Sequence, residues 1–269
     1  MEKEKLSVRD FWDEASCGEV LYMKGSELKE QFNNQLKRRY ELEPYIIPFA
    51  DFPRWKGKKT LEIGVGLGAD HQMFAQNGAD LHGCDLTPRA ISNTTNRFKL
   101  FELDSKLQVA DAENLPYDNN EFDLVYSWGV IHHSPKTQKA VNEIYRILKK
   151  GGSTRIMIYH TYSFVGYMLW VRYALFRCKP FTSLKTIYSK YLESPGTKAY
   201  TVKEAKKLFK NYSTTEVETV LTHGDLLSSN AGQRHEGKLL DIARKIFPRN
   251  IIKLFFPSHG LFMLIKATK

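Results

Sequence analysis

The sequence predicts an α/β fold in which a mostly parallel sheet carries helices on both of its faces. Short apolar runs alternate with helix-like segments from residue 60 to residue 159. A glycine-rich turn follows the first apolar run, and acidic residues follow the second and the third. Alternating strands and helices favour a parallel sheet, because each connection between two strands lays a helix across one face.

Seven strands are expected, five in the first 160 residues and two near the end of the chain. Apolar runs bounded by turn residues predict strands at 60–63, 80–84, 106–109, 122–127, 154–159, 216–222 and 261–267. The last two strands would complete the sheet that the first five begin, so we expect one seven-stranded sheet.

Helices are expected between these strands. The sequence pattern predicts them at 69–77, 88–101, 136–149 and 201–211, with further helical segments within 1–50. Thr87 and Pro88 form a typical helix start, because the threonine can cap the helix and proline suits its first turn. Gly151-Gly152, behind two lysines, is a typical end for the helix at 136–149.

Both ends of the chain depart from this regular alternation. Pro44, Pro48 and Pro53 are expected to break the N-terminal helical pattern. Residues 163–177 are strongly apolar and aromatic, yet too short to span a bilayer. Residues 225–258 would form a long irregular or helical insertion between the last two strands.

The composition is that of a globular domain in a reducing compartment. The chain has 269 residues, 42% of them hydrophobic, which suffices for one domain core. Cys17, Cys84 and Cys178 are too widely spaced to suggest a disulfide framework or a cysteine-rich metal site, and we expect no metal. The charged N-terminus is not followed by an apolar segment, so we predict no signal peptide and a cytoplasmic location.

The net charge of +10 is unevenly distributed along the chain. Residues 1–160 hold 22 Lys and Arg against 23 Asp and Glu, a net charge of −1, whereas residues 161–269 hold 18 against 7, a net charge of +11. The basic C-terminal part has four interpretations: solvated helix faces, an anionic substrate, an acidic lipid surface or nucleic acid.

The turn after the first strand reads Glu62-Ile63-Gly64-Val65-Gly66-Leu67-Gly68. Glycines let the backbone turn sharply and let a ligand approach it closely. A dinucleotide brings its pyrophosphate to this position, where Glu62 would repel it. The same carboxylate would attract a cationic amino-acid group. The turn therefore favours S-adenosylmethionine over a dinucleotide.

Two further acidic motifs stand at the ends of the next two strands. Asp85 ends the second strand, where a carboxylate can accept hydrogen bonds from ribose hydroxyls. Asp111-Ala112-Glu113 follows the third strand, where a carboxylate can accept from an adenine amino group and the Ala112 N–H can meet a ring nitrogen. Contacts at the carboxyl ends of successive strands are typical of ligand sites in open α/β sheets.

With these motifs the sequence resembles the class I S-adenosylmethionine-dependent methyltransferases. The matching segments are LEIGVGLG (61–68), GCDLT (83–87), VADAENLPYDNNEFDLVYSWGVIHHSP (109–135) and EIYRILKKGG (143–152). They are most similar to the small-molecule branch that includes ubiquinone- and menaquinone-type methyltransferases. The resemblance implies a Rossmann-like fold, S-adenosylmethionine as methyl donor and S-adenosylhomocysteine as product.

The resemblance also implies a division of the chain. Residues 1–55 would form an N-terminal helical lid, and residues 56–160 the Rossmann-like core that binds S-adenosylmethionine. Residues 161–269 would hold the insertions that cover the substrate and the last strands of the same domain.

The roles of individual residues follow from the family's motifs. The methionine end of the cofactor would contact Glu62, Gly64, Gly66 and Gly68, and its nucleoside Asp85, Leu86, Asp111, Ala112 and Glu113. The Ser127 carbonyl would bind the cofactor's ammonium group, and Trp128 would line the methyl-transfer chamber with His132. Asp70 and His71 are expected to cap the next helix and to lie at the surface.

His132 and His133 are the candidate catalytic residues, together with Tyr159. Histidine can exchange a proton near neutral pH. Adjacent residues of a helix point about 100° apart, so one ring can face the chamber while the other bonds elsewhere. A general base, a positioning residue and a structural residue are all open interpretations. Tyr159 and His160, at the end of the fifth strand, would orient the acceptor.

The choice of acceptor is expected to lie in the variable ends of the chain. Phe11, Trp12 and Tyr22 would either form a lid over the substrate or pack an N-terminal helix on the sheet. The segment 163–177 would be a lid helix, a dimer contact or a membrane-surface element. Arg172 within it suits an anionic group on the substrate.

The predicted reaction is methylation of a small or medium-sized organic acceptor, with O- or N-methylation slightly favoured. The sulfonium is an activated donor, so alignment of the two reactants can supply most of the catalysis. Alternatives are a lipid or quinone at a membrane surface and a nucleic acid. Nucleic acid is less favoured, because Ser127-Trp128-Gly129-Val130 stands where base-modifying relatives often carry an Asn/Asp-Pro-Pro-Tyr sequence. A non-catalytic binder is disfavoured by the intact loop.

Overall fold

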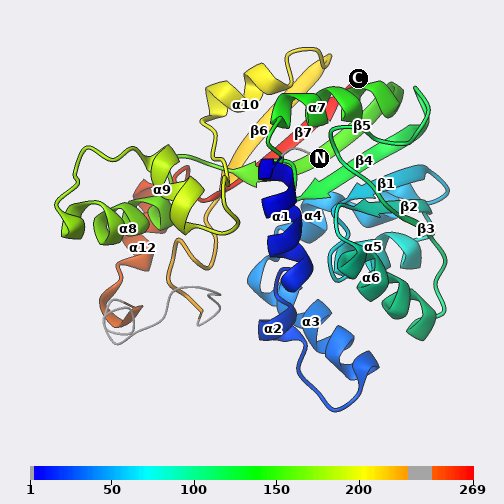
Figure 1. Cartoon of the computed structure of the whole chain (residues 1–269), viewed down its shortest axis with the longest axis horizontal. Coiled ribbons are helices and arrows are strands. Elements are labelled where there is room, and N and C mark those ends of the chain that lie inside the picture. The colour runs from blue at the N-terminus through cyan, green and yellow to red at the C-terminus, as the bar shows by residue number, and fades with distance from the viewer. Residues whose placement is uncertain (1–2, 230–243) are drawn as a thin grey trace.

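One sheet of seven strands organises the chain (Figure 1). The computed structural model describes residues 3–229 and 244–269. The strand order is β3-β2-β1-β4-β5-β7-β6. The strands are β1 Lys59–Ile63, β2 Asp80–Asp85, β3 Lys106–Val109, β4 Phe122–Trp128, β5 Leu148–Tyr159, β6 Thr214–Val220 and β7 Phe262–Thr268. The predicted seven-stranded sheet is confirmed.

The strands β1, β2, β3 and β4 run in the same direction, so their carboxyl ends lie at the same edge of the sheet. The pairs β1–β2, β1–β4, β2–β3 and β4–β5 are parallel, and β7 runs antiparallel to both β5 and β6. Glu62 pairs with Gly83 on one side and with Tyr126 on the other, so the glycine-rich turn leaves from the middle of the sheet.

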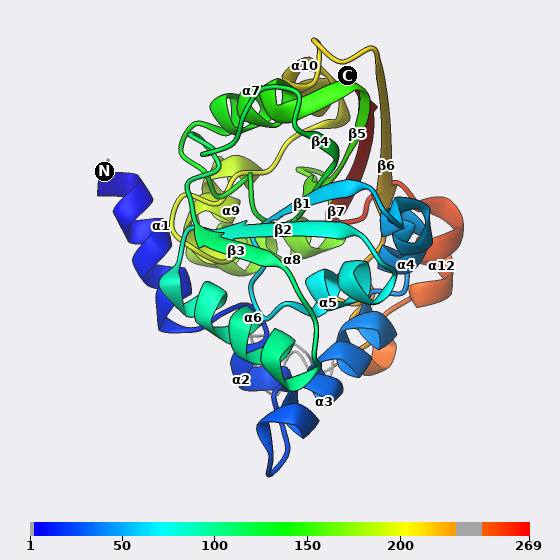
Figure 2. The same cartoon turned by 90° about the vertical axis from the view of Figure 1, so that its right-hand side faces the viewer.

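Helices cover both faces of the sheet, as predicted (Figure 2). One core contains Val141 and Ile144 of α7 (Thr137–Ile147) and Ala205 of α10 (Val202–Leu208). The other contains Phe74 of α5 (Ala69–Gln76) and Phe98 of α6 (Pro88–Leu100). Each helix buries one apolar side against the sheet, which is why the strands between the two layers are almost continuously apolar.

The N-terminal part contains the helices α1 Lys3–Glu14, α2 Glu19–Tyr22, α3 Leu28–Leu42 and α4 Ile46–Ala50, and the 3₁₀ turn η1 Phe52–Trp55. The prediction that prolines break this pattern is wrong for two of them. Pro48 lies in α4 and Pro53 in η1, each in the first turn of a short helix. Proline is tolerated there because its missing N–H would have no helical partner.

The helix predicted at 136–149 ends earlier than its lysines and glycines suggested. α7 stops at Ile147, and β5 begins at Leu148 and continues through Gly151-Gly152. The β4–β5 register shifts between the pairs Phe122–Leu148 and Leu124–Ser153. Gly151 has φ +73°, a conformation that glycine adopts freely, so the two glycines form an irregularity within a strand.

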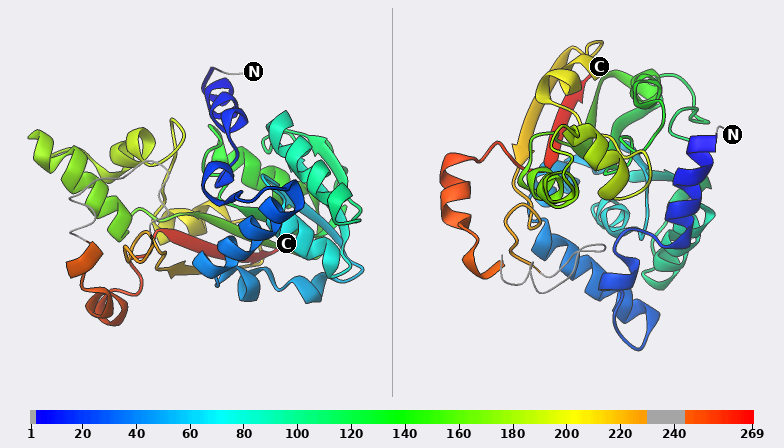
Figure 3. Two further views of the ribbon diagram at one scale, coloured as in Figure 1. Left: turned by 90° about the horizontal axis from the view of Figure 1, so that it is seen from below. Right: turned by 60° about the vertical axis from the view of Figure 1, so that its left-hand side comes forward.

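The segment 163–177 is helical and belongs to a lobe that stands apart from the sheet, on the side away from α5 and α6 (Figures 1 and 3). The lobe contains α8 Phe164–Tyr173, the 3₁₀ turn η2 Leu175–Arg177 and α9 Leu184–Tyr191, joined by Leu169, Ala174 and Ile187. α12 Arg249–Phe255 lies within the insertion predicted at 225–258, of which residues 230–243 lie outside the described residues. No helix in the described part of the chain is long and apolar enough to cross a membrane.

Candidate active site

A cavity of about 920 Å³ opens at the carboxyl ends of the central strands. Its floor is formed by the turn after β1, by Asp85–Thr87 after β2 and by Trp128–Val130 at the end of β4. Its walls are formed by side chains of α1, α2, α3 and α8. The site is therefore built where an open parallel sheet ordinarily binds its ligand.

The glycine-rich turn passes close to its neighbours at Gly64 yet is open at Gly66. A Cβ at Gly64 would lie 2.1 Å from Val130 Cγ2, so only glycine fits there. Gly66 has φ +53°, and a Cβ there would meet no atom within 4 Å. Its carbonyl accepts from Thr94 Oγ1 at 3.2 Å, which ties the turn to α6. A ligand can thus reach the backbone at Gly66.

Asp85 holds the turn from the neighbouring strand. Its Oδ2 accepts from the Gly66 N–H at 3.2 Å, and its Oδ1 accepts from the Thr87 N–H and Oγ1, both at 2.9 Å. Burial raises the pKa of Asp85, while these three donors oppose that shift. Two carboxylate oxygens can accept about four hydrogen bonds, so capacity for a further donor remains.

Lys5 of α1 reaches the acidic motif after β3. Its Nζ lies 2.6 Å from Asp111 Oδ2 and 2.7 Å from Glu113 Oε2. Burial opposes the charge of Lys5, but its hydrogen bonds to the two carboxylates raise its pKa. Glu113 also accepts from Ser134 Oγ and the Lys136 N–H, so its oxygens face protein groups. Asp111 and Ala112 border the cavity.

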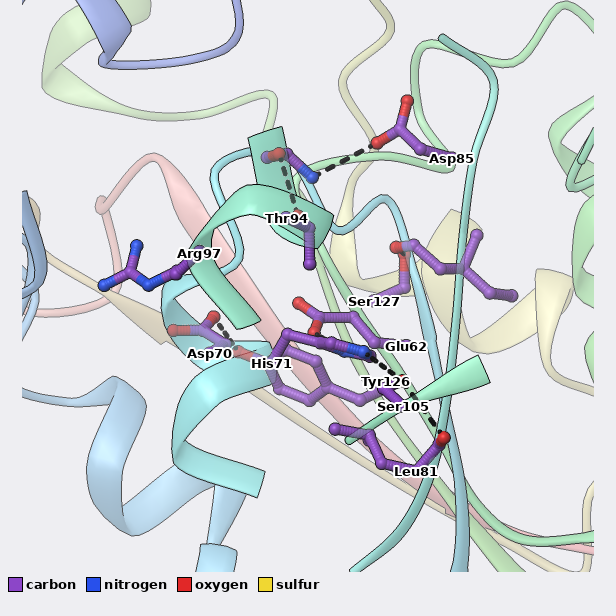
Figure 4. Close-up of polar contacts among 12 residues, drawn as sticks. Glu62, Asp70, His71, Leu81, Asp85, Thr94, Arg97, Ser105, Tyr126 and Ser127 are labelled. Atoms are coloured by element: carbon purple, nitrogen blue, oxygen red, sulfur yellow. Dashed lines mark hydrogen bonds and ion pairs between the residues drawn. The ribbon is translucent and has the colours of Figure 1, made fainter. Parts of the chain in front are cut away.

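Glu62 and His71 form a buried pair beneath the turn (Figure 4). His71 Nδ1 lies 2.9 Å from Glu62 Oε2, and His71 Nε2 lies 2.7 Å from Ser105 Oγ. Burial, with repulsion from Asp70, raises the pKa of Glu62 well above its usual range. Burial lowers the pKa of His71 to about 3. His71 is therefore neutral. A cationic ligand beside Glu62 would stabilise the ionised form of the Glu62 carboxylate.

Asp70 is a second buried carboxylate of this site. Arg39 of α3 binds it through two nitrogens, at 2.8 and 2.6 Å, and Tyr40 and Tyr126 donate to it at 2.9 and 2.8 Å. Burial would raise the pKa of Asp70, but Arg39 and the two tyrosines lower it. The expectation that Asp70 and His71 lie at the surface is wrong, because both are buried under α3 and the turn.

The far end of the cavity carries a polar group formed by His133, Tyr159 and Glu193. Tyr159 Oη donates to Glu193 Oε2 at 2.6 Å. His133 Nδ1 lies 2.8 Å from Ser194 Oγ, and its Nε2 lies 3.4 Å from Glu193 Oε2. Glu193 lies far from the histidines in sequence, and no spacing pattern identified it.

His132 lies beside this group but does not border the cavity. Its ring is fully buried, with its centroid 4.1 Å from that of Tyr159 and 4.2 Å from that of His133. Burial lowers the pKa of His132 well below its usual range, and the charges of His133 and Lys198 lower it further.

Most of the residues predicted from the sequence border this one cavity. They are Phe11, Trp12, Tyr22, Glu62, Gly64, Gly66, Gly68, Asp85, Leu86, Asp111, Ala112, Trp128, His133, Tyr159 and Arg172. Four do not border it: Glu113, Ser127, His132 and His160. Ser127 Oγ donates to the Ile63 carbonyl at 3.1 Å, and His160 Nδ1 donates to the Gly260 carbonyl at 3.2 Å. Arg39, Glu43, Asp70 and Glu193 border it without having been predicted.

The residues present fit a nucleoside that carries a cationic amino-acid group. The open backbone at Gly66 admits a ligand close to the turn. Asp85, with an accepting position left, stands where ribose hydroxyls bind in such sheets. Glu62 presents a carboxylate rather than the small residue that a pyrophosphate requires.

Comparison with known proteins agrees with this geometry. A family model described as a methyltransferase domain matches residues 61–156. The chain is 35% identical over 117 residues to phosphoethanolamine N-methyltransferase 2 of Caenorhabditis elegans, a match covering 42% of this chain and 26% of that protein. It is 26% identical over 194 residues to demethylmenaquinone methyltransferase of Tropheryma whipplei (strain Twist), covering 66% of this chain and 80% of that protein.

The fold also resembles that of a solved methyltransferase. Phosphoethanolamine N-methyltransferase 2 of Haemonchus contortus, in complex with phosphomonomethylethanolamine and S-adenosylhomocysteine, superposes with a TM-score of 0.63 at 18% identity. The likeness covers 97% of this chain and 60% of that one. This chain thus matches about a quarter of the nematode relative named first and four fifths of the bacterial one. The domain match and these relatives support placing the chain among the class I S-adenosylmethionine-dependent methyltransferases, and the solved structure shows that it shares their fold.

Proposed function

We propose that the chain methylates a small or medium-sized organic acceptor that is partly apolar and carries an anionic group. The observation that supports this proposal most is that acidic residues and aromatic or basic residues border the same cavity. Glu62 and Asp85 border this cavity together with Trp12, Tyr22 and Arg172. Ligand pockets usually measure about 300–1,000 Å³, so a cavity of about 920 Å³ has room for a cofactor and an acceptor together.

The chain's own residues hold the cofactor. Asp85 would bind the ribose hydroxyls, Asp111 and Ala112 the adenine edge, and Glu62 the cationic amino-acid end. When bound, S-adenosylmethionine supplies a methyl group activated by the positively charged sulfur.

The acceptor's reacting atom would bind at the polar group of His133, Tyr159 and Glu193. A hydroxyl or amine would find hydrogen-bond partners there, which supports O- or N-methylation over C-methylation. His133 would orient this atom or take up its proton. Because the donor is already activated, correct alignment would supply most of the rate acceleration.

The helices around the cavity would close it over the two reactants. Phe11, Trp12 and Tyr22 border it from α1 and α2, and Arg172 from α8. In this proposal residues 1–55 and 161–269 choose the acceptor, whereas residues 56–160 hold the cofactor. Exclusion of water would strengthen the interaction of Arg172 with an anionic substrate.

A lipid or quinone acceptor taken from a membrane surface is a second candidate. Phe176 borders the cavity and is 69% exposed, and Phe181 in the same lobe is fully exposed. Such aromatic side chains beside Arg172 suit an amphipathic acceptor. A nucleic-acid acceptor has only the pI of about 9.3 in its favour.

Calorimetric titration tests the proposal. The purified chain is titrated separately with S-adenosylmethionine, S-adenosylhomocysteine and NAD, and micromolar binding is expected for the first two only. Acceptors are then screened with labelled S-adenosylmethionine, from phosphorylated amines to hydroquinones. Tight cofactor binding without transfer to any member of a broad panel would indicate a non-catalytic relative.

A further inference from the structure

A buried group of two imidazoles and one carboxylate lies at the wall of the acceptor chamber. Among the residues that the structure describes, His132, His133 and Glu193 each offer one donor atom, and these three atoms lie within 4.8 Å of one another. His133 and Glu193 border the cavity. Imidazole nitrogen and carboxylate oxygen are ligands that zinc and related divalent metals prefer.

Two neighbouring hydroxyl groups contact Nδ1 of His133. Ser194 Oγ lies 2.8 Å from this nitrogen, and Thr197 Oγ1, which donates to the Ser194 carbonyl at 2.7 Å, lies 3.1 Å from it. When Nδ1 carries the hydrogen of the neutral ring, it can donate to either hydroxyl oxygen. In that tautomer Nε2 has a lone pair, 3.4 Å from Glu193 Oε2.

In that tautomer two electron-rich atoms face each other, and a positive charge between them would remove their repulsion. A proton on His133 Nε2 would supply that charge, but it would leave His132 without any partner. Both ring nitrogens of His132 are buried and make no hydrogen bond. Leaving a buried polar group unsatisfied costs about 1–3 kcal/mol. One divalent cation would bind a nitrogen from each ring and the carboxylate at the same time.

We propose that His132, His133 and Glu193 bind a divalent metal ion of the zinc type, with an open position toward the acceptor chamber. Three protein ligands and one open position are the arrangement of catalytic zinc sites. Ligands at about 2.0–2.1 Å from a tetrahedral zinc ion are about 3.3 Å apart, close to the 3.4 Å between Nε2 and Oε2.

The contacts around these three residues are those that support metal ligands elsewhere. A ligating histidine usually donates its other N–H to a protein oxygen, and Ser194 Oγ and Thr197 Oγ1 both lie within hydrogen-bond distance of His133 Nδ1. A ligating carboxylate usually accepts a further hydrogen bond, as Glu193 does from Tyr159 at 2.6 Å. An ion at this place would bind an acceptor oxygen and favour its deprotonated form, and His133 would then act as a ligand that positions the ion and would not itself take up the proton. The proposal goes beyond methyl transfer and does not depend on the acceptor's identity.

The test measures metal directly on the full chain, purified without a metal-binding tag. The protein is freed of metal with a chelator, then titrated with Co²⁺ and separately with Zn²⁺ against a competing dye. We expect equimolar binding of Co²⁺ with the visible absorption of four-coordinate cobalt, and displacement by Zn²⁺. If neither ion binds in equimolar amount, the proposal is overturned.

Four variants locate the site. His132→Gln and Glu193→Gln are expected to weaken Co²⁺ binding by more than about 100-fold, beyond the 10–100-fold that losing a supporting contact costs. Thr197→Val removes only such a contact, so about a 10-fold loss is expected. The matched control is His82→Gln: His82 Nε2 is also buried without a partner, but it belongs to no such group among the described residues. Wild-type affinity in both ligand variants, or an equal loss in the control, would contradict the site.

Binding of S-adenosylhomocysteine and circular dichroism show whether each variant is folded, and they separate the two proposals. A chain that binds this product and methylates an acceptor but binds no metal would overturn the metal site and leave the proposed function standing. A chain that binds Co²⁺ at these residues but binds neither cofactor nor product would overturn the proposed function and leave the metal site standing.

Discussion

Asp85 shows how one side chain can serve both the fold and the cofactor. It accepts hydrogen bonds from the Gly66 N–H in the turn and from the N–H of Thr87, the residue that caps α6. The same side chain also borders the cavity. Three of its hydrogen bonds are internal, so its geometry is set before a ligand arrives. A carboxylate held in this way needs no rearrangement to bind ribose, which is why we expect its contribution to affinity to be large.

Replacing Asp85 by Asn is expected to weaken S-adenosylhomocysteine binding about 10- to 100-fold. Hydrogen bonds to a charged group contribute about 1.5–3 kcal/mol, and the amide keeps the size but not the charge. Isothermal calorimetry gives the affinity, and Asp80→Asn, exposed at the start of the same strand, is the control. Equal affinities for wild type and Asp85→Asn would remove Asp85 from the cofactor site.

His71 predicts a pH dependence of stability. Burial lowers its pKa to about 3, whereas an unfolded chain protonates histidine at about 6.5. The unfolded state therefore binds the extra proton first, and stability falls as the pH drops below about 6.5. At pH 5 the loss from this group is about 2 kcal/mol. Urea unfolding at pH 7.5 and 5 measures it, and His71→Gln should show a difference smaller by about that amount. The same difference in both proteins would contradict this origin.

At the scale of elements, α1 is attached to the sheet by charged groups. Lys5 joins it to the turn after β3, and Arg89 at the start of α6 binds Glu19 of α2 at 2.5 Å. Side chains of α1 and α2 thus border the cavity, and these helices are held in place by ion pairs together with packing by Val8.

Lys5→Ala is expected to loosen α1. The change leaves Glu113, whose side chain is 2% exposed, without its cation, and removing one partner of a buried pair costs about 3–5 kcal/mol. Hydrogen exchange of α1 amides should accelerate, while Lys3→Ala, exposed on the same helix, should exchange like wild type. Slow, wild-type exchange in Lys5→Ala would show that packing alone holds this helix.

Arg39 joins α3 to α5 through Asp70 and is the most consequential ion pair of the site. Arg39→Leu would leave a carboxylate that is 2% exposed without a cation, a loss of about 3–5 kcal/mol. At about 2–4 °C per kcal/mol, Tm should fall by about 10 °C in thermal denaturation.

Two further variants test the origin of that loss. Adding Asp70→Asn to Arg39→Leu should recover much of the stability, because no buried charge then remains. Arg38→Leu is the matched control, since Arg38 pairs with Glu41 at the surface. A double variant no more stable than Arg39→Leu would mean that packing by the arginine, rather than charge, is what was lost.

At the scale of the whole molecule, the C-terminal part of the chain carries both the excess of positive charge and several exposed apolar side chains. Residues 161–269 carry a net charge of +11. Leu254 and Phe255 of α12 are 72% and 68% exposed, and Phe181 beside α9 is fully exposed. Basic and aromatic side chains together are typical of surfaces that meet acidic lipid.

The chain is therefore expected to bind vesicles containing acidic lipid at low salt and to leave them as salt rises, because surface charges are screened. Co-sedimentation measures this, with neutral vesicles and an unrelated RNA for comparison. Leu254→Ser with Phe255→Ser should reduce binding, whereas Val20→Ser, 71% exposed on α2, should not. Binding to RNA but not to acidic vesicles would indicate that the basic C-terminal part binds nucleic acid and not acidic lipid.

The alternation of apolar runs was enough to predict the seven strands, because the central strands are largely buried on both faces and are mostly apolar, whereas the edge strands β3 and β6 are only partly buried. The closely spaced glycines and the acid at the end of the second strand also predicted the turn residues, although Gly64 is constrained by the distant Val130 and Asp85 binds the Gly66 N–H from the neighbouring strand. The same local reading failed at Gly151-Gly152, where a helix-end pattern lies in a strand. It failed again at Pro48, which lies inside a short helix.

By itself the sequence determined the sheet, the glycine-rich turn and the nature of the cofactor, because each depends on residues close together in the chain. The tertiary structure alone decided which distant side chains meet. It buried Asp70 against Arg39, it placed Lys5 on Asp111, and it brought Glu193 to the two histidines. Such contacts depend on how helices from both ends of the chain pack over the strand ends, and no periodicity or spacing records that packing.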